Sequence, residues 1–394
     1  MLSIFLNYRK QSTKFLGTES EEKCIEYGVP QGYVLGPLLF LIYINDIINS
    51  GTLGKFILFA DDTNIFVVGD SEKEVYEKAN IVLDEVNRYM CSNQLHINIS
   101  KSCYIHFKPN FANEERMTCA RLRPIDTIYS LKLNGQKLKQ VDNVKFLGVI
   151  IDEKLSWDSH ITYLETKLKL SIVIIKRIKR FIPVTEYEMI YNALFLSHLT
   201  YCITSWGGTS KTKLSKIFSI QKRCIRLLFG NEYTFDHREF YETCARARSY
   251  ENHKLKKNFA LEHTKPIFNG KSILNLENLY KYHSFMEVFK IIKFQTPISL
   301  FQLFNMSHRY HKYTLNLPKL KLDKTMHNFP YSPSVMWNSL VSHILLPCEP
   351  GDDGLVIPGS KQNSDMSAST AFVKSKLKSI LLKHQKSGDQ VLWN

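Results

Sequence analysis

The stretch that most constrains this chain covers residues 55–68 and reads K-F-I-L-F-A-D-D-T-N-I-F-V-V. Two apolar runs, 56–59 and 65–68, flank the adjacent aspartates Asp61 and Asp62. Both runs are rich in β-branched and aromatic residues, so they predict two short strands that meet in a hairpin. The two carboxylates are then expected at the hairpin tip, held on a buried and rigid base.

Adjacent aspartates allow two interpretations. Neighbouring side chains on a strand point to opposite faces, so Asp61 and Asp62 share a site only if one of them lies in the turn. Two negative charges this close are unfavourable unless a cation lies between them. Mg²⁺ takes carboxylate, water and phosphate oxygens, and two such ions can catalyse phosphoryl transfer. The alternative is a solvated turn, where aspartate is common.

The charge of the chain favours a polyanionic partner. The 394 residues leave room for two or three domains, and 44% of them are hydrophobic, which is sufficient for a core. Lysine and arginine number 52 against 37 aspartates and glutamates, giving a net charge of +15 that is spread along the chain. Nucleic acid is the commonest partner of such a protein, and general solubility is the alternative.

The cysteines show neither a C-x-x-C motif nor zinc-site spacing, which predicts reduced thiols in an intracellular protein, nuclear or cytoplasmic. No uninterrupted run of about 18 apolar residues exists, so we expect no transmembrane segment. The N-terminus lacks a secretory pattern. The eight cysteines are Cys24, Cys91, Cys103, Cys119, Cys202, Cys224, Cys244 and Cys348.

A loop rich in glycine and proline precedes the aspartates. Gly28, Gly32 and Gly36 are spaced by four, and Pro37 is suited to the first position of a helix. Such a loop suits close approach to a nucleotide or template strand, and ordinary turn chemistry is the alternative. The helix is predicted to be largely buried, because it carries Leu38, Leu41, Ile42, Ile44, Ile47 and Ile48.

Taken together, these segments resemble the reverse transcriptases of non-long-terminal-repeat (LINE-type) retrotransposons, above all the jockey-like insect elements. The resemblance implies a right-hand polymerase of the α+β class with fingers, palm and helical thumb. It also implies RNA-directed DNA synthesis with two Mg²⁺ ions, an RNA template, a DNA primer and deoxynucleoside triphosphates. The matching segments are Gly28–Gly32, Leu35–Phe40, Tyr43–Ile47 and Phe59–Thr63.

The resemblance assigns roles to individual residues. Gln31 and Gly32 would border the incoming nucleotide and the template, and Asp61 and Asp62 would be the catalytic metal ligands of the palm. Lys101 would lie near the triphosphate or the palm edge, and a solvated turn lysine is the alternative. Similarly, the Phe146, Leu147 and Gly148 segment resembles the hairpin that holds the 3′ end of the primer.

Two departures from the family pattern bear on activity. Tyr33 stands where the family has a small serine, so it would crowd the nucleotide pocket. The family also needs an aspartate on an earlier palm strand, whereas the first aspartate here is Asp46. Residues 5–11 resemble the segment that follows this strand. We therefore expect the chain to begin within the fingers and palm, with an incomplete two-metal site. Whether an intact element carries an upstream endonuclease domain is left open by the sequence.

Local patterns predict further elements between the aspartates and residue 152. Ser71 and Glu74 form a capping box that begins a helix through Met90. Alternating apolar residues predict a strand over 95–99, and a second strand is expected over 103–107. A polar loop over 109–127 follows, and then Asn134-Gly135 predicts a hairpin turn.

Residues 158–230 read as helices, as expected of a thumb. Asp158 and His160 mark a helix start, since no partner ligands lie near them for a metal. Pro183 interrupts the pattern, a capping box of Thr185 and Glu188 predicts a helix to about residue 205, and Gly230 predicts the end of the last helix. Basic residues on these helices suit a duplex phosphate backbone, or are simply solvated: Lys176, Arg177, Lys222, Arg223 and Arg226.

The C-terminal part carries weaker signals. A helix is expected over 276–294 and another over 371–382, with a flexible Gly/Pro/Ser/Asp-rich linker over 349–370. Basic and aromatic residues mix over 307–324, which suits single-stranded nucleic acid or an exposed loop. Residues 329–340 resemble a tail found after the thumb in these elements.

The sequence therefore predicts three regions, namely incomplete fingers and palm over 1–152, a helical thumb over 153–230, and a C-terminal retroelement tail over 231–394. Three hypotheses for function follow. The chain is an active reverse transcriptase completed by a carboxylate from elsewhere, a catalytically dead copy that still folds, or a non-catalytic nucleic-acid binder that uses the basic thumb. We expect family membership without activity of this chain alone.

Overall fold

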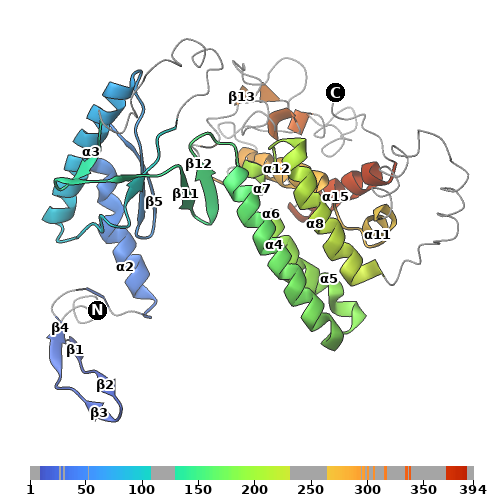
Figure 1. Ribbon diagram of the computed structural model, residues 1–394, viewed down its shortest axis with the longest axis horizontal. Helices are drawn as coiled ribbons and strands as arrows, with labels where there is room; N and C mark the ends of the chain where they lie inside the picture. The colour runs from blue at the N-terminus through green and yellow to red at the C-terminus, as the bar shows by residue number, and fades with distance from the viewer. Residues whose placement is uncertain are drawn as a thin grey trace, which may run out of the picture. The chain divides into compact units, whose positions relative to one another are not determined.

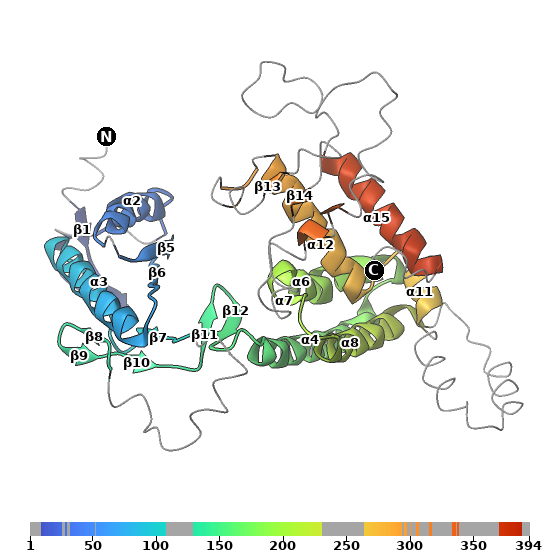
Figure 2. The same ribbon diagram turned by 90° about the horizontal axis from the view of Figure 1, so that it is seen from above.

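The computed structural model forms two compact units, residues 1–142 and 143–394 (Figures 1 and 2). It contains both helices and strands, as predicted. Among the described residues, no helix is long and apolar enough to cross a membrane. The structure describes residues 9–25, 28–29, 32–51, 53–107, 129–230, 264–293, 295–297, 300, 305–306, 315–316, 333–335, 337–338 and 370–387.

The first unit begins with two antiparallel strand pairs, one nested inside the other. The outer pair places Arg9 opposite Ile25, and the inner pair places Lys14 opposite Glu19. An exposed ion pair of 3.2 Å joins Lys10 of β1 to Glu22, the residue before β4. The strands are β1 (Arg9–Gln11), β2 (Lys14–Phe15), β3 (Thr18–Glu19) and β4 (Lys23–Ile25).

The helix predicted after the glycine-rich loop is present but not largely buried. Helix α2 (Leu35–Ile44) begins two residues before Pro37 and continues into the 3₁₀ helix η1 (Asn45–Asn49). Ile44 and Ile47 are buried against helix α3. In contrast, Leu38 is 53% exposed and Ile42 is 63% exposed, and the predicted core residues Leu41 and Ile48 are exposed too. The prediction failed because the helix is apolar on every side while the described elements cover only one side of it.

The predicted hairpin around the aspartates is confirmed. Strands β5 (Lys55–Phe59) and β6 (Asp62–Phe66) pair antiparallel along their whole length. The inner face packs against the α2–η1–α3 cluster through Phe56, Leu58 and Ile65. The other face leaves Ile57 and Phe66 exposed. The hairpin base is thus held from one side only.

Helix α3 (Glu72–Ser92) begins where the capping box predicts. The Ser71 hydroxyl accepts the Glu74 backbone N–H at 3.3 Å. The Glu74 carboxylate in return accepts the backbone N–H of Asp70, one residue earlier than in the standard motif, at 2.8 Å. The apolar stripe, with Val82 and Val86 almost fully buried, forms the core of the first unit.

The segment after α3 departs from prediction at both expected strands. Residues 95–99 form no strand, because Asn98 instead accepts local hydrogen bonds from Ser100, Lys101 and Ser102, which compete with sheet pairing. The strand predicted over 103–107 is only β7 (Cys103–Tyr104), which pairs in parallel with β10 (Lys139–Gln140). The predicted loop over 109–127 lies outside the described residues.

The predicted Asn134-Gly135 turn is confirmed. It joins β8 (Lys132–Leu133) to β9 (Gln136–Lys137). Both turn residues have positive φ, 49° for Asn134 and 75° for Gly135, as two-residue hairpins of this kind require. Asn80 on α3 fixes this hairpin by accepting the Lys132 N–H at 3.0 Å.

The second unit begins with a hairpin joined to a long helix through one buried carboxylate. Strands β11 (Asn143–Phe146) and β12 (Val149–Asp152) lead into α4 (Asp158–Ile178), which begins where predicted. The Asp152 carboxylate accepts the backbone N–H groups of Lys154, Ser156 and Trp157 at 3.1, 2.8 and 2.8 Å. It thereby fixes a loop that contains Trp157 at a φ of 66°.

Helices follow Pro183 as expected, but the predicted capping box does not form. Thr185 lies inside the 3₁₀ turn η4 (Val184–Glu186), so its side chain caps no helix. The predicted single helix to residue 205 is instead divided, with a π-helical segment and a break at Cys202, whose φ is 49°. The elements are η3 (Lys179–Phe181), α5 (Tyr187–Ile190), η5 (Tyr191–Leu196), α6 (Ser197–Thr200) and α7 (Ile203–Trp206).

Helix α8 (Lys211–Phe229) packs beside α4 and runs parallel to it (Figures 1 and 2). Near the start of both helices, the Lys213 ammonium contacts Asp158 at 2.8 Å. Near their ends, the Lys179 ammonium donates to the Leu227 carbonyl. As predicted, α8 ends at Gly230.

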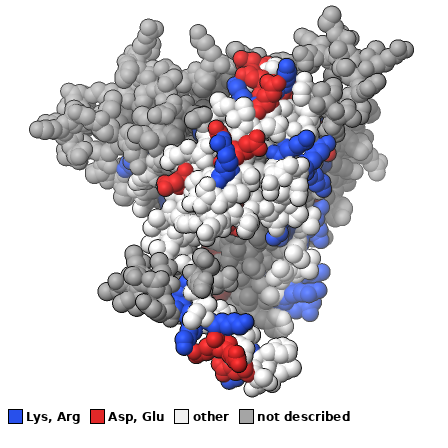
Figure 3. All heavy atoms as spheres, turned by 90° about the vertical axis from the view of Figure 1, so that its left-hand side faces the viewer, with Lys and Arg blue, Asp and Glu red and all other residues white. Residues whose placement is uncertain are grey.

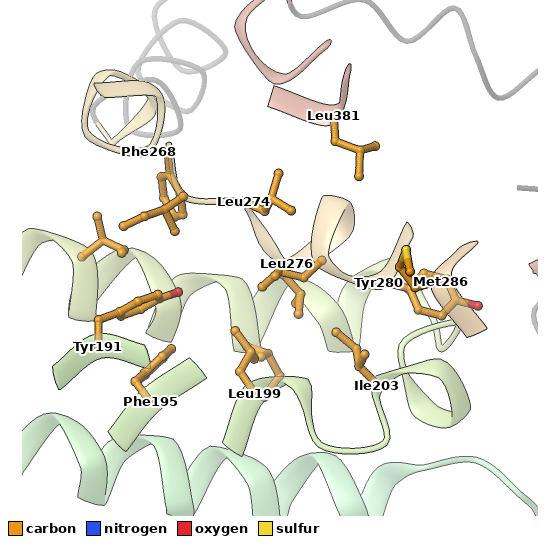
Figure 4. Packing of buried hydrophobic residues seen from close by; sticks show 14 of the residues in the cluster. Tyr191, Phe195, Leu199, Ile203, Phe268, Leu274, Leu276, Tyr280, Met286 and Leu381 are labelled. Carbon is orange, nitrogen blue, oxygen red and sulfur yellow. The ribbon is translucent and has the colours of Figure 1, made fainter. Parts of the chain in front are cut away.

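One continuous core holds the second unit together. Figure 4 shows Tyr191, Phe195, Leu199 and Ile203 meeting apolar side chains from the C-terminal helices. The predicted helix over 276–294 is α12, and the predicted C-terminal helix is α15, five residues longer at its end than expected. The elements after α8 are α11 (Lys265–Gly270), α12 (Leu276–Ile292), β13 (Asn305–Met306), β14 (Leu315–Asn316) and α15 (Thr370–Ser387).

A polar network also docks α15. The Gln385 carboxamide accepts from the Asn275 backbone and from the Asn278 side chain, both at 3.1 Å, and donates to the Ile273 carbonyl at 3.1 Å. The predicted linker over 349–370, except Thr370, and most of the predicted segments over 307–324 and 329–340 lie outside the described residues.

We predict that Asp152→Ala lowers the unfolding free energy of the second unit by about 2–4 kcal/mol, because three backbone N–H groups lose a buried acceptor. Urea unfolding followed by circular dichroism measures this loss. Asp152→Asn retains one acceptor oxygen and should cost less. Glu188→Ala, at an exposed carboxylate of the second unit, is the control. Equal stability of Asp152→Ala and this control would contradict the assigned role.

Candidate functional site

The two aspartates occupy the tip of the β5–β6 hairpin. Phe59 pairs with Asp62, so Ala60 and Asp61 form a two-residue turn. Ala60 has a φ of 51°, in the left-handed region that disfavours any residue with a Cβ. Backbone strain of this kind is found at functional sites, where the surrounding structure holds it in place. The residue with the unfavourable backbone conformation, Ala60, therefore lies directly beside the carboxylate pair.

Both carboxylates are accessible to a ligand. Asp61 and Asp62 are exposed, and neither carboxylate makes a hydrogen bond or an ion pair with a described residue. Their hard oxygens suit one Mg²⁺ ion whose remaining positions are filled by water or phosphate oxygens. Throughout the ranges that the structure describes, no group of three or more His, Cys, Asp or Glu side chains could hold a metal ion. The described residues therefore do not bring together enough ligands for two metal ions.

The loop residues predicted to bind nucleotide and template are only partly described. Gly32 has a φ of 88°, and a Cβ placed there would meet no atom within 4 Å, so the backbone is open to close approach. Tyr33 is 59% exposed. Gln31 lies outside the described residues. Lys101 is exposed in a local turn, where its N–H donates to the Asn98 carbonyl at 3.1 Å.

The predicted primer-contact segment forms the turn of the β11–β12 hairpin. Phe146 pairs with Val149, and the turn residues Leu147 and Gly148 have φ values of 44° and 87°. The hydroxyl of Tyr201 donates to the Leu147 carbonyl at 2.6 Å. The hairpin and its support therefore lie within the second unit.

The five basic residues predicted to bind a phosphate backbone come from the same end of the parallel helices α4 and α8. Four of them are exposed, namely Lys176, Arg177, Arg223 and Arg226. Lys222 is partly buried, with its ammonium 4.9 Å from the centre of the Phe218 ring, and burial lowers its pKa. Figure 3, by comparison, shows a face where basic and acidic side chains are interspersed.

Asp158 is part of the joint between α4 and α8. Its carboxylate bonds to Lys213, and this hydrogen bond lowers its pKa. The geometry thus supports the predicted helix start at this position and assigns Asp158 an ion pair within the second unit.

His160 is buried, with 3% of its surface exposed, among the rings of Trp157, Tyr163 and Trp206. Its Nδ1 accepts the Ile150 backbone N–H at 3.3 Å, which requires the neutral imidazole with its proton on Nε2. Burial lowers the pKa of His160. It therefore joins strand β12 to the helical core as a neutral side chain.

Sequence reasoning did not identify Tyr201 or Asp152. Tyr201 lies 54 residues from the carbonyl that it holds. Asp152 ends an apolar strand, and its three N–H partners are local. An aspartate followed by a serine and a helix start was the only available signal for Asp152. Nothing in the local sequence marks Tyr201.

Comparison with known proteins gives a consistent match in the first part of the chain. Residues 3–151 match the family described as reverse transcriptase (RNA-dependent DNA polymerase). This range contains the aspartate hairpin, the glycine-rich loop and the β11–β12 turn. No solved structure matches this chain.

Several proteins of insect mobile elements are similar. The RNA-directed DNA polymerase from mobile element jockey of Drosophila funebris is 26% identical over 240 residues, covering 58% of this chain and 25% of that protein. The probable RNA-directed DNA polymerase from transposon X-element of Drosophila melanogaster is 26% identical over 242 residues, covering 59% and 25%. The chain therefore spans about a quarter of the length of these relatives.

The match to a third relative covers a larger share of that relative's length. The retrovirus-related Pol polyprotein from type-1 retrotransposable element R1 2 of Nasonia vitripennis is 22% identical over 184 residues. The match covers 45% of this chain and 43% of that protein.

We predict that the second unit loses stability as the pH falls below about 6.5. The folded-state pKa of His160 is lowered, so below the ordinary histidine value the unfolded chain binds the additional proton. His283, whose pKa burial also lowers, adds to the effect. Urea unfolding at pH 7.5 and 5.5 measures it.

His160→Asn retains an acceptor for the Ile150 N–H but cannot titrate in this range, so it should reduce the pH dependence. His198→Asn, at an exposed histidine, is the control and should leave it unchanged. A pH dependence that is the same in all three proteins would show that His160 does not contribute.

Proposed function

Because residues 3–151 are a reverse transcriptase domain related to those of the jockey, X-element and R1 non-LTR retrotransposons, we propose that this chain serves RNA-directed DNA synthesis. The observation that carries the proposal is the strained β5–β6 turn, which presents two unpartnered carboxylates among the described residues. A solvated turn needs neither the strain at Ala60 nor a second aspartate beside the first.

Each group of residues, in the first unit and in the second, has its own proposed task. Asp61 and Asp62 hold divalent metal, which supplies charge neutralisation at the transferring phosphate. Gly32 allows the backbone close to the incoming nucleotide and template, with Gln31 beside it and Lys101 toward the triphosphate. Tyr33 narrows the same pocket. The turn formed by Phe146, Leu147 and Gly148 supports the 3′ end of the primer.

The helices α4 and α8 suit the duplex backbone. Their exposed basic residues lie at one shared end, and phosphate contacts of this kind position a duplex without reading its sequence. In right-hand terms, residues 1–152 are proposed as fingers and palm, 153–230 as thumb, and 231–394 as tail. The partners are an RNA template, a DNA primer and deoxynucleoside triphosphates.

We further propose that residues 1–394 bind primer–template without extending it. The resemblance implies a third metal carboxylate on a strand before the glycine-rich loop, and the first aspartate of this sequence is Asp46. A segment or chain that supplies this carboxylate would complete the two-metal site. The remaining residues bind and orient the substrates in either case.

We predict that Mg²⁺ with the complementary nucleotide slows dissociation of the chain from primer–template, because Asp61 and Asp62 link metal to triphosphate. Dissociation is followed by fluorescence anisotropy, with a non-complementary nucleotide as the control. The double variant Asp61→Ala/Asp62→Ala should lose the effect. The same mixtures, assayed for extension, should yield none.

Two outcomes would contradict these proposals differently. An equal dissociation rate with complementary and non-complementary nucleotides would contradict the polymerase site itself. Extension that the double variant abolishes would confirm the metal ligands and refute the proposed incompleteness.

We also predict that binding weakens steeply with salt, since each neutralised phosphate contributes roughly 0.9 to the slope of log K against log[salt] on B-DNA. The double variant Arg223→Gln/Arg226→Gln removes two phosphate contacts and should therefore reduce the magnitude of that slope by roughly 2. Lys374→Gln/Lys378→Gln, at exposed lysines of α15, is the matched control. Salt-independent binding, or equal effects of both double variants, would exclude the end of α4 and α8 as the phosphate contact.

A further inference from the structure

The turn of the β11–β12 hairpin has a conformation that its own sequence does not favour. Leu147 and Gly148 both have positive φ, the requirement of a type I′ turn. The β8–β9 hairpin meets the same requirement with Asn134 and Gly135, residues that adopt it readily. Leucine carries a cost of about 1–2 kcal/mol in this region. The Leu147 turn therefore needs support from outside the hairpin.

Tyr201 supplies that support through two contacts. Its hydroxyl donates to the Leu147 carbonyl at 2.6 Å. Its ring edge lies 3.2 Å from the position that a Cβ on Gly148 would occupy, so the ring closes directly over the glycine. One side chain thus fixes both residues of the turn, from 54 positions further along the chain.

The backbone of Tyr201 is itself anchored in the core. Trp206, with none of its surface exposed, donates from its indole N–H to the Tyr201 carbonyl at 3.0 Å. The chain breaks between α6 and α7 at Cys202, whose φ is 49°. The break directs Tyr201 outward, where it remains 50% exposed. A rigid connection therefore runs from the buried tryptophan to the surface turn.

We propose that Tyr201 is a positioning residue that holds the Leu147–Gly148 turn in the conformation that receives the primer 3′ end. This inference rests on the proposed function, because the primer contact of the turn is part of it. Tyr201 acts through the turn: it fixes the carbonyl and the glycine backbone against which the terminal nucleotide lies. The phosphate contacts on α4 and α8 are separate and supply most of the affinity for the duplex.

The test compares Tyr201→Phe with the wild-type chain of 394 residues. The variant removes only the hydroxyl and keeps the ring over Gly148. Two ligands are used, an RNA–DNA duplex with a recessed primer 3′ end and the matching blunt duplex. Anisotropy measures the dissociation constant of each ligand, and 2-aminopurine at the primer terminus or at an internal position reports local stacking.

Tyr201→Phe should reduce the preference for the recessed end by about threefold to tenfold, the effect of one lost hydrogen bond. Affinity for the blunt duplex and the internal probe signal should stay within about twofold, whereas the terminal probe signal should change. Tyr89→Phe is the matched control, since its hydroxyl also donates to a backbone carbonyl, that of Tyr43, in the first unit. It should leave every readout unchanged.

The outcomes distinguish the proposed primer contact of the turn from the positioning role of Tyr201. A wild-type chain without preference for the recessed end would overturn the proposed primer contact and the role of Tyr201 with it. A wild-type preference that Tyr201→Phe retains in full would overturn the positioning role alone. An equal loss of affinity for both ligands, with the terminal signal unchanged, would also overturn it, because a general structural defect has that signature.

Discussion

One buried carboxylate, Asp152, fixes the loop through which the chain enters the helices of the second unit. Asp152 accepts three backbone N–H groups in the loop between strand β12 and helix α4, so it fixes the direction in which helix α4 leaves the hairpin. Because α8 runs parallel to α4, this direction also sets where the basic ends of both helices lie. Hydrogen bonds to a carboxylate acceptor are stronger than those between neutral groups, so three of them together hold the loop firmly.

The hairpin is connected to the helical core at its other points as well. His160 accepts the Ile150 N–H from the first turn of α4, and Tyr201 holds the turn from the break between α6 and α7. The base, middle and tip of the hairpin are thus each fixed by a different side chain. This arrangement explains how a short two-stranded hairpin, marginal in isolation, keeps a defined shape.

The first unit uses a different principle at the aspartate pair. One face of the β5–β6 hairpin packs on α3 and η1, and the tip projects past this contact with its carboxylates exposed. The packed apolar face holds the hairpin in place, and the carboxylates lie only at its turn. The strain at Ala60 is compatible with this division, since the paired strands hold the turn from both sides.

The sequence alone determined the elements whose signals are local. Turn chemistry and periodicity predict the β5–β6 hairpin around the adjacent aspartates and the β8–β9 turn. Capping and helix-start signals predict where α3 and α4 begin. The same local rules failed at Asn98, where local hydrogen bonds compete with sheet pairing, and at Thr185, which lies inside a 3₁₀ turn. They also failed for α2, because an apolar helix does not reveal how much of it neighbouring elements cover. Only the tertiary structure brought Tyr201 to Leu147 and the basic ends of α4 and α8 together. Contacts between residues far apart in the chain arise from packing, and no pattern within a single segment encodes them.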